Sequence, residues 1–196
     1  MASLSEIEAA LRKTLSSERF THTLGVRNTA VEFHSAWKLQ EPSEDEIQRM
    51  ALLHDYAKEM GPIELHRALV HGWLTLGTEL LDFPGLDHAP LSAAYARHKF
   101  GVTDHSILSA IAYHPTGHPS FGPVGLILFL SDYLEPNRPF ENHRGPLLQT
   151  AYENPERAAL EVYEEKLHYV QLQDRQIHPI SLAFEHSLRK RLNSAS

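Results

Sequence analysis

The stretch SEDEIQRMALLHDYAKEMGP, residues 43–62, decides the local fold and carries the first chemical signal of the chain. Ser43 followed three residues later by Glu46 is the signature of a capping box at a helix N-terminus. Gly61-Pro62 is a stop signal, and the apolar residues between the two signals recur at intervals of three and four. The stretch therefore predicts one helix that continues to the stop signal and carries the doublet His54-Asp55.

The same helical period runs through most of the chain. It predicts further helices over about residues 4–15, 20–37, 62–71, 73–81, 90–99, 104–113, 145–171 and 179–192. The first of them has two candidate capping boxes, Ser3 with Glu6 or Ser5 with Glu8. The apolar run Val124–Tyr133 fits a buried strand or a buried helix, and its helical surroundings favour the helix.

Length and composition are typical of one soluble domain. The chain has 196 residues with no internal repeat and no linker, which predicts a single all-α domain over residues 1–196 with C-terminal helices at about 145–192. A hydrophobic content of 42% and a charged content of 22% are ordinary for a globular protein. The chain has no cysteine, which excludes disulfides, zinc–thiolate sites and thiol nucleophiles.

Charge and hydropathy narrow the choice of partners. A net charge of −7 argues against a binder of duplex nucleic acid, which normally shows a basic face. An anionic small substrate is still compatible with this charge, because bound metal ions invert the local field of a site. The longest apolar run, Val124–Leu130, is far too short to span a bilayer, and the N-terminal region lacks the apolar centre of a signal peptide. We therefore expect a cytoplasmic protein that binds neither a nucleic-acid duplex nor a membrane.

Histidine and aspartate side chains that could bind metal accompany the doublet in the order H, HD, H, H, D. They are His22, His54, Asp55, His88, His114 and Asp132. Imidazole nitrogens and carboxylate oxygens together suit first-row transition metals. Each residue alone has an ordinary explanation as a hydrogen-bonded or solvated side chain, but the set predicts one or two bound metal ions. A metal-dependent hydrolase is therefore the leading hypothesis.

Two of these positions carry further information. Asp132 interrupts an apolar segment, where a charged side chain is costly to bury unless it is paired or bound to metal. Asp55 has two carboxylate oxygens and can bridge two cations, whereas a neutral imidazole binds one. On the predicted helix, Lys58 lies three residues after Asp55 and four after His54. Its ammonium group is therefore expected on the same face, where it would meet a phosphate.

The order of these residues resembles that of a known superfamily. His22, His54-Asp55 and Asp132 resemble the ligands of the HD-domain superfamily of metal-dependent phosphohydrolases. The extra pair, His88 and His114, is similar to that of the binuclear branch of this superfamily.

Four sequence blocks resemble the YqeK family more specifically, which comprises bacterial symmetrical bis(5′-nucleosyl)-tetraphosphatases. They are LLHDYAKEM (52–60), HAPLSAAYARHKFGV (88–102), AIAYHPTG (110–117) and LSDYLEPNRPF (130–140). The similarity runs from about Arg19 to Phe140, and its most specific part is Asp132 to Arg138.

The resemblance implies an HD fold that holds two metal ions, divalent or mixed-valence and usually iron, in a core of about residues 19–140. By position, one ion would be bound by His22, His54, Asp55 and Asp132, and the other by Asp55, His88 and His114. The implied reaction is symmetrical hydrolysis of diadenosine tetraphosphate into two molecules of ADP. The chain departs from the family at Pro115, where members often have threonine, and this substitution alters the loop beside His114.

The candidate catalytic and substrate-binding residues lie next to these ligands. Asp55 and Lys58 are the candidate catalytic residues, because metal ions bound at Asp55 would lower the pKa of a bridging water and neutralise phosphate oxygens. Lys58 and Arg138 are expected to hold phosphate charge, the arginine by its fork geometry and the lysine as a mobile point charge. Thr116 and Gly117 could supply a hydroxyl and a close backbone approach to the phosphates.

Two other functions stay open at this point. An HD phosphohydrolase acting on another nucleotide would use the same ligands and differ in its pocket. A non-catalytic module would keep the metal and the nucleotide but lose turnover. The helices from about residue 145 onward could pack on the core or form the interface of a homodimer.

Overall fold

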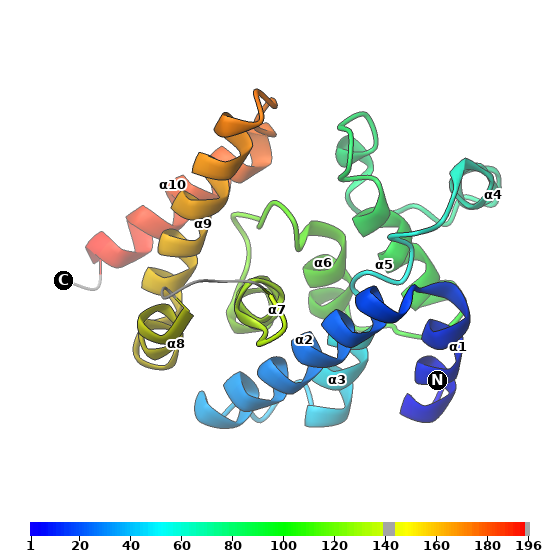
Figure 1. Ribbon diagram of the computed structural model, residues 1–196, viewed down its shortest axis with the longest axis horizontal. Coiled ribbons are helices and arrows are strands. Elements are labelled where there is room, and N and C mark those ends of the chain that lie inside the picture. Colours follow the sequence, from blue (N-terminus) through cyan, green and yellow to red (C-terminus); the bar gives the residue numbers. More distant parts are fainter. Residues whose placement is uncertain (139–143, 195–196) are drawn as a thin grey trace.

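Helices account for all the regular secondary structure in residues 1–138 and 144–194, which are the residues that this computed structural model describes (Figure 1). In chain order they are α1 (Leu4–Thr14), α2 (Ser17–Ala36), α3 (Glu44–Leu53), α4 (Pro62–Val70), the short 3₁₀ helix η1 (Thr78–Leu80), α5 (His88–His98), α6 (His105–Tyr113), α7 (Pro123–Leu134), α8 (Arg144–Glu153), α9 (Pro155–Leu172) and α10 (Pro179–Ser194). The all-α prediction is confirmed. Phe140, the predicted end of the metal-site core, lies outside the described residues. None of the described helices has the length and apolar character needed to cross a lipid bilayer.

Local hydrogen bonds set the starts of α1 and α3 where the sequence predicted them. The first of the two candidate capping boxes forms at α1, where the Glu6 N–H donates to Ser3 Oγ at 3.3 Å and the Ser3 N–H donates to Glu6 Oε2 at 2.8 Å. At α3 the Ser43 N–H donates to Glu46 Oε2 at 2.9 Å. Each box satisfies backbone groups that a helix N-terminus otherwise leaves unpaired.

The helix that carries the doublet is shorter than predicted, because α3 ends at Leu53. The N–H of Ala57, which would bond to the Leu53 carbonyl in a continued α-helix, donates instead to Ser92 Oγ in α5 at 3.0 Å. From Tyr56 onward the backbone bonds run over three residues, as between the Lys58 N–H and the Asp55 carbonyl at 2.9 Å. Such a chain has about three residues per turn, so Asp55 and Lys58 still lie on one side of it.

The predicted helix over residues 73–81 is wrong apart from η1. Gly72 and Gly77 have φ angles of +65° and +69°, in the left-handed region that glycine adopts without strain. These two positions bend the chain on either side of residues 73–76, so only a short 3₁₀ turn forms.

The predicted helix over residues 145–171 is in fact two helices, α8 and α9, with Asn154 between them. The Asn154 side chain accepts a hydrogen bond from the Arg157 N–H at 3.0 Å and so caps α9. Pro155 follows as the first residue of α9, where its missing N–H costs nothing.

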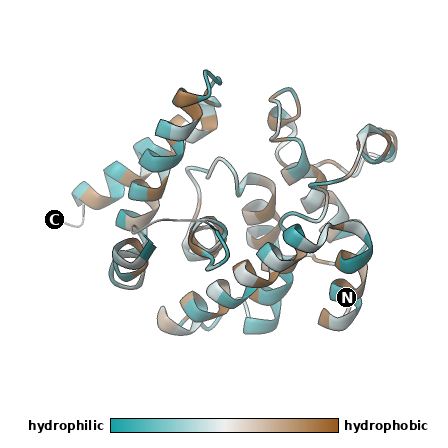
Figure 2. Ribbon diagram, viewed as in Figure 1, coloured by the Kyte–Doolittle hydropathy of each residue, from teal (hydrophilic) through white to brown (hydrophobic). Residues whose placement is uncertain are grey.

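The apolar run Val124–Tyr133 is a buried helix, as its surroundings predicted, and forms most of α7. This helix lies near the centre of the molecule, with α2 and α6 on one side and α9 on the other (Figure 1). Figure 2 shows hydrophobic and hydrophilic residues on the same helix in α2, α3 and α9, as expected for helices that each bury one face. The core position of α7 carries Asp132 into the interior.

The C-terminal helices pack on this core. Helix α9 contacts α7, and α10 contacts α9. Phe184 of α10 is completely buried, with its ring 5.1 Å from that of Phe129 in α7. It also fills the space above Gly117, where an added Cβ would lie 2.1 Å from Phe184 Cδ1. This contact joins α10 to the core, and the single domain over residues 1–196 stays a prediction.

We expect Phe184→Ala to lower the free energy of unfolding of the whole protein by about 3–5 kcal/mol, because it removes a buried ring and leaves a cavity. If the C-terminal helices belong to the same cooperative unit, chemical denaturation monitored by circular dichroism should still show one transition at a lower midpoint. Leu182→Ala is the control, since Leu182 lies on the same helix with 48% of its surface exposed. A separate early transition in Phe184→Ala would contradict the single domain.

Candidate metal centre

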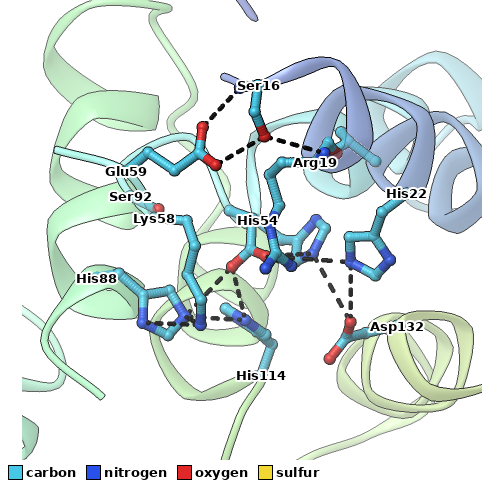
Figure 3. A network of polar contacts seen from close by, with 12 residues as sticks. Ser16, Arg19, His22, His54, Lys58, Glu59, His88, Ser92, His114 and Asp132 are labelled. Carbon is cyan, nitrogen blue, oxygen red and sulfur yellow. Dashed lines mark hydrogen bonds and ion pairs between the residues drawn. The ribbon is translucent and has the colours of Figure 1, made fainter. Parts of the chain in front are cut away.

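The predicted metal ligands come together in the interior, although they are distant in the sequence (Figure 3). All of them are buried: His22 in α2, His54 and Asp55 directly after α3, His88 at the start of α5, His114 directly after α6, and Asp132 in α7. Most of these positions lie at or next to helix ends, where the chain can turn a side chain inward.

Asp55 lies at the centre of this cluster, and its two oxygens face different imidazoles. Oδ1 lies 3.2 Å from His88 Nε2 and 3.4 Å from His114 Nε2. Oδ2 lies 3.6 Å from His54 Nε2 and 4.0 Å from His22 Nε2. The carboxylate therefore stands between two pairs of histidines.

Asp132 completes the pair formed by His22 and His54. Its Oδ1 lies 3.2 Å from His22 Nε2 and 3.9 Å from His54 Nε2. One ligand atom from each of these three residues lies within 4.8 Å of the others, and the same holds for His54, Asp55 and His114. The Nε2 atoms of His88 and His114 are 3.4 Å apart.

Hydrogen bonds fix the tautomers of the histidines. His54 Nδ1 lies 2.7 Å from the Ala51 carbonyl and His114 Nδ1 lies 2.9 Å from the Ile111 carbonyl. Because a carbonyl oxygen only accepts, both Nδ1 atoms carry the proton, and the lone pair of each ring is on Nε2. These are the Nε2 atoms that face Asp55.

The charge states of His54, His88 and the two carboxylates suit metal binding, whereas contacts with Asp132 and Glu135 raise the pKa of His22. Burial lowers the pKa of His54 to about 3, and it also lowers the pKa of His88. Burial alone would raise the pKa of Asp55 and Asp132, but neighbouring histidines and, for Asp132, the Arg138 charge hold both well below the usual range. At neutral pH His54 and His88 are therefore neutral donors and both carboxylates are anionic.

The residues present fit a metal centre. His54 Nε2 is buried and has no hydrogen-bond partner in the part of the chain that the structure describes. Buried polar atoms are nearly always paired, and a lone pair that faces two carboxylates without a hydrogen-bond partner fits a metal ligand. The donors are nitrogen and oxygen only, which suits iron, manganese, cobalt or zinc.

Three basic side chains border the cluster. Arg19 donates to Asp55 Oδ2 at 3.1 Å, and Lys58 Nζ lies 3.0 Å from His88 Nε2. Arg138 donates to Asp132 twice, to Oδ1 at 2.6 Å and to the backbone carbonyl at 2.7 Å. The predicted phosphate contacts of Lys58 and Arg138 stay predictions. Arg19 was not predicted, although it lies one helical turn before His22 on α2.

Thr116 and Gly117 have clear structural roles. The Thr116 hydroxyl lies 2.9 Å from the Gly117 carbonyl and 3.3 Å from the Tyr113 carbonyl, and it can donate to either. Gly117 has a φ of +68° and packs against Phe184, so this position requires glycine for conformation and space. Their predicted contacts with phosphate stay predictions.

Glu135 is a residue of the centre that the sequence analysis missed. It is 1% exposed, and its Oε1 accepts a hydrogen bond from His22 Nδ1 at 3.2 Å. Its Oε2 accepts from the backbone and side-chain N–H groups of Asn137 at 2.8 and 2.9 Å. Gly25 makes room for this carboxylate, because a Cβ there would lie 2.1 Å from Glu135 Oε2. Such a carboxylate orients a metal-binding imidazole and raises its basicity.

We expect Glu135→Gln to weaken metal binding by about 10- to 100-fold. Glutamine replaces one of the two carboxylate oxygens with an NH₂ donor, so it cannot accept hydrogen bonds at both the His22 and the Asn137 positions. Competition with a chelator measures the affinity, and Glu18→Gln on the exposed side of α2 is the control. Gly25→Ala should act in the same direction by displacing Glu135. Unchanged affinity in both variants would show that His22 needs no such support.

Two cavities lie beside the cluster. One of about 250 Å³ is lined by Lys58 and His88, and another of about 600 Å³ is lined by Thr116 and Lys166. Gly85 borders both of them. The arrangement provides space for a substrate on two sides of the ligand set.

The helical core and this set of ligands define a protein of the HD-domain class. The family model of the HD domain matches residues 19–137, and the chain belongs to this family. The predicted family is thereby confirmed.

Three curated relatives of the chain carry the same enzyme name. A protein of Halalkalibacterium halodurans named symmetrical bis(5′-nucleosyl)-tetraphosphatase is 37% identical over 126 residues, which are 64% of this chain and 65% of that protein. A protein of Bacillus subtilis strain 168 with the same name is 35% identical over 136 residues, covering 69% of this chain and 70% of that protein. The predicted relationship to the symmetrical tetraphosphatases is therefore confirmed.

A solved structure shows the same fold over nearly the whole chain. It is described as a predicted HD superfamily hydrolase involved in NAD metabolism from Clostridium acetobutylicum. The two chains are 26% identical with a TM-score of 0.87, and the match covers 97% of this chain and 99% of the other. The C-terminal helices are thus part of the shared fold.

Proposed function

We propose that this protein is a metal-dependent phosphohydrolase that cleaves diadenosine tetraphosphate symmetrically into two molecules of ADP. The observation that carries the proposal is the buried cluster centred on Asp55, in a chain whose relatives are named symmetrical bis(5′-nucleosyl)-tetraphosphatases. The ligands supply the hydrolytic chemistry of the HD class, and the relatives indicate the substrate.

The proposed centre holds two ions, and iron is the proposed metal. His22, His54, Asp55 and Asp132 would hold one ion, and Asp55, His88 and His114 the other. The positions of the two Asp55 oxygens support this division, since each faces a different pair of imidazoles. Bound ions of this kind lower the pKa of water and neutralise phosphate oxygens.

The basic residues around the cluster would position the polyphosphate. Arg19, Lys58 and Arg138 form a cationic rim on a chain whose net charge is −7, so an anionic substrate meets positive potential at this place. Water attacks one of the two middle phosphorus atoms, the bond from that phosphorus to the central bridging oxygen breaks, and ADP leaves with this oxygen. The attacked phosphorus becomes the terminal phosphate of the second ADP.

A substrate panel with product analysis tests this function. Metal-loaded protein under reducing conditions should convert diadenosine tetraphosphate to ADP alone, and in ¹⁸O-labelled water the label should enter the terminal phosphate of one ADP in each pair. ATP plus AMP as products would contradict symmetrical cleavage. Bound metal without turnover of any nucleotide would support the non-catalytic alternative.

The panel should include NAD and mononucleotides. The Clostridium acetobutylicum structure is described as involved in NAD metabolism, and NAD also joins two nucleosides through phosphates. Faster turnover of NAD than of diadenosine tetraphosphate would favour a hydrolase of another nucleotide. The cytoplasmic location and the homodimer stay predictions.

A further inference from the structure

A cavity of about 600 Å³ lies between the core and the C-terminal helices. Phe129 of α7 forms part of its wall, α9 contributes Lys166 and Val170, and the segment before α10 contributes His178. Its volume is in the range of sites for small organic ligands, roughly 300–1,000 Å³. No residue of this cavity from α9 or α10 belongs to the predicted metal or substrate sites.

The cavity adjoins the metal centre. Thr116 lines it, and this residue is only two positions after the ligand His114. Lys166 reaches into the same region, close enough to Asp132 and Lys58 for their charges to act on its pKa. A ligand in the cavity would therefore place its charged end near the reacting phosphates.

Lys166 is a partly buried cation whose charge no carboxylate neutralises at close range. Its ammonium lies 4.6 Å from the centre of the Phe129 ring, and no ion pair joins it to a carboxylate in the described part of the chain. Burial lowers its pKa to about 8, so it is mostly protonated at neutral pH. A phosphate is the kind of partner that such a group lacks.

The other walls suit a nucleoside. Phe83 lies in the segment before α5. It lines the cavity together with His178, and the centres of their two rings are 4.4 Å apart, so the rings pack against each other. Val170 and Ile177 add apolar surface. Asp82 and Arg175 also line the cavity. Aromatic and apolar walls together with the cations Lys166 and Arg175 match the two ends of a nucleotide, the base and the phosphates.

We propose that this cavity binds one nucleoside diphosphate half of the substrate, with its phosphates against Lys166 and its base between the apolar walls. The inference rests on the proposed function for the identity of the substrate. It assigns to the C-terminal helices a direct part in binding: the phosphate chain runs from Lys166 across the metal ligands toward Lys58.

Two pairs of variants test the proposal, with ADP as the probe. Val170→Trp fills the cavity, and Leu172→Trp on the exposed side of the same helix is its control. Lys166→Gln removes the cation, and Lys13→Gln on exposed surface of α1 is its control. Equilibrium binding of ADP to metal-loaded protein, and KM and kcat for diadenosine tetraphosphate, are measured for all four.

Val170→Trp should weaken ADP binding and raise KM about tenfold or more, because a bulky side chain takes the place of the ligand. Its hydrolysis of inorganic tetraphosphate, which has no nucleoside, should stay within about twofold of the control. Lys166→Gln should weaken ADP binding by about 10- to 100-fold through loss of a charge-assisted contact. Equal ADP affinity in each variant and its control would overturn the proposal.

The readouts separate this proposal from the proposed function. If the wild-type protein does not cleave diadenosine tetraphosphate, the proposed function fails, while the ADP affinities still decide whether the cavity is the nucleotide site. If Val170→Trp does not fold, as judged by circular dichroism, the Lys166→Gln and Lys13→Gln pair decides alone.

Discussion

Asp55→Ala is expected to lose bound metal and hydrolytic activity together. Its carboxylate is 3% exposed, and its oxygens are the only groups that face both pairs of histidines in the described residues. Without this carboxylate, no negative charge lies between the two pairs of histidines, which are His22 with His54 and His88 with His114. A loss of several kcal/mol of transition-state stabilisation corresponds to roughly a 1,000-fold fall in kcat. Elemental analysis and ADP release measured on the same sample test this expectation.

Asp45→Ala is the matched control for this variant. Asp45 lies on the exposed side of α3 and pairs with Arg49, so its removal leaves the interior unchanged. Circular dichroism should show that Asp55→Ala keeps the helical fold. If Asp55→Ala kept the metal content of the wild-type protein, the assignment of Asp55 as a metal ligand would be wrong.

The parts of the fold that the sequence predicted depend on interactions between near neighbours. The capping boxes at Ser3 and Ser43 involve residues three positions apart, and they form as predicted. The buried helix α7 followed from an unbroken apolar run. Asp132 stood out because a charge in such a run needs a partner, and the structure provides Arg138 and His22.

The parts that the sequence did not predict depend on contacts between distant segments. The end of α3 is accompanied by the bond between Ala57, in the turn after α3, and Ser92 in α5. Glu135 supports His22 across 113 positions, and only the space at Gly25 makes that contact possible. No local pattern contains such information.

Lys166 shows the same limit at the candidate substrate site. In the sequence it is one charge within a helical stretch, and nothing nearby separates it from surface lysines. The role that we propose for it depends on the packing of α9 on α7, which brings the ammonium to 4.6 Å from the centre of the Phe129 ring. The cavity is lined by residues from five separate stretches of the chain, so no single stretch of sequence could predict it.

His88→Ala is expected to separate the two proposed metal positions. Of the two Asp55 oxygens, His88 lies beside Oδ1, and its Nε2 lies 3.4 Å from that of His114. The set of His22, His54 and Asp132 does not depend on it. The variant should therefore keep one metal ion per chain, against the two that we propose for the wild-type protein. His105→Ala, an exposed histidine at the start of α6, is the control and should keep both ions.

The activity of His88→Ala should fall by more than about 100-fold, which exceeds the loss typical of substitutions around a ligand shell. A single ion, which His22, His54 and Asp132 would hold, would neutralise phosphate charge but would lower the pKa of water less than two ions would. A comparison of the metal content of His88→Ala and Asp55→Ala then shows whether the cluster holds one metal ion or two. If both variants lose the same amount of metal, the cluster holds a single ion and the bridging role of Asp55 is wrong. If His88→Ala loses one ion and Asp55→Ala loses both, the two oxygens of Asp55 serve two metals.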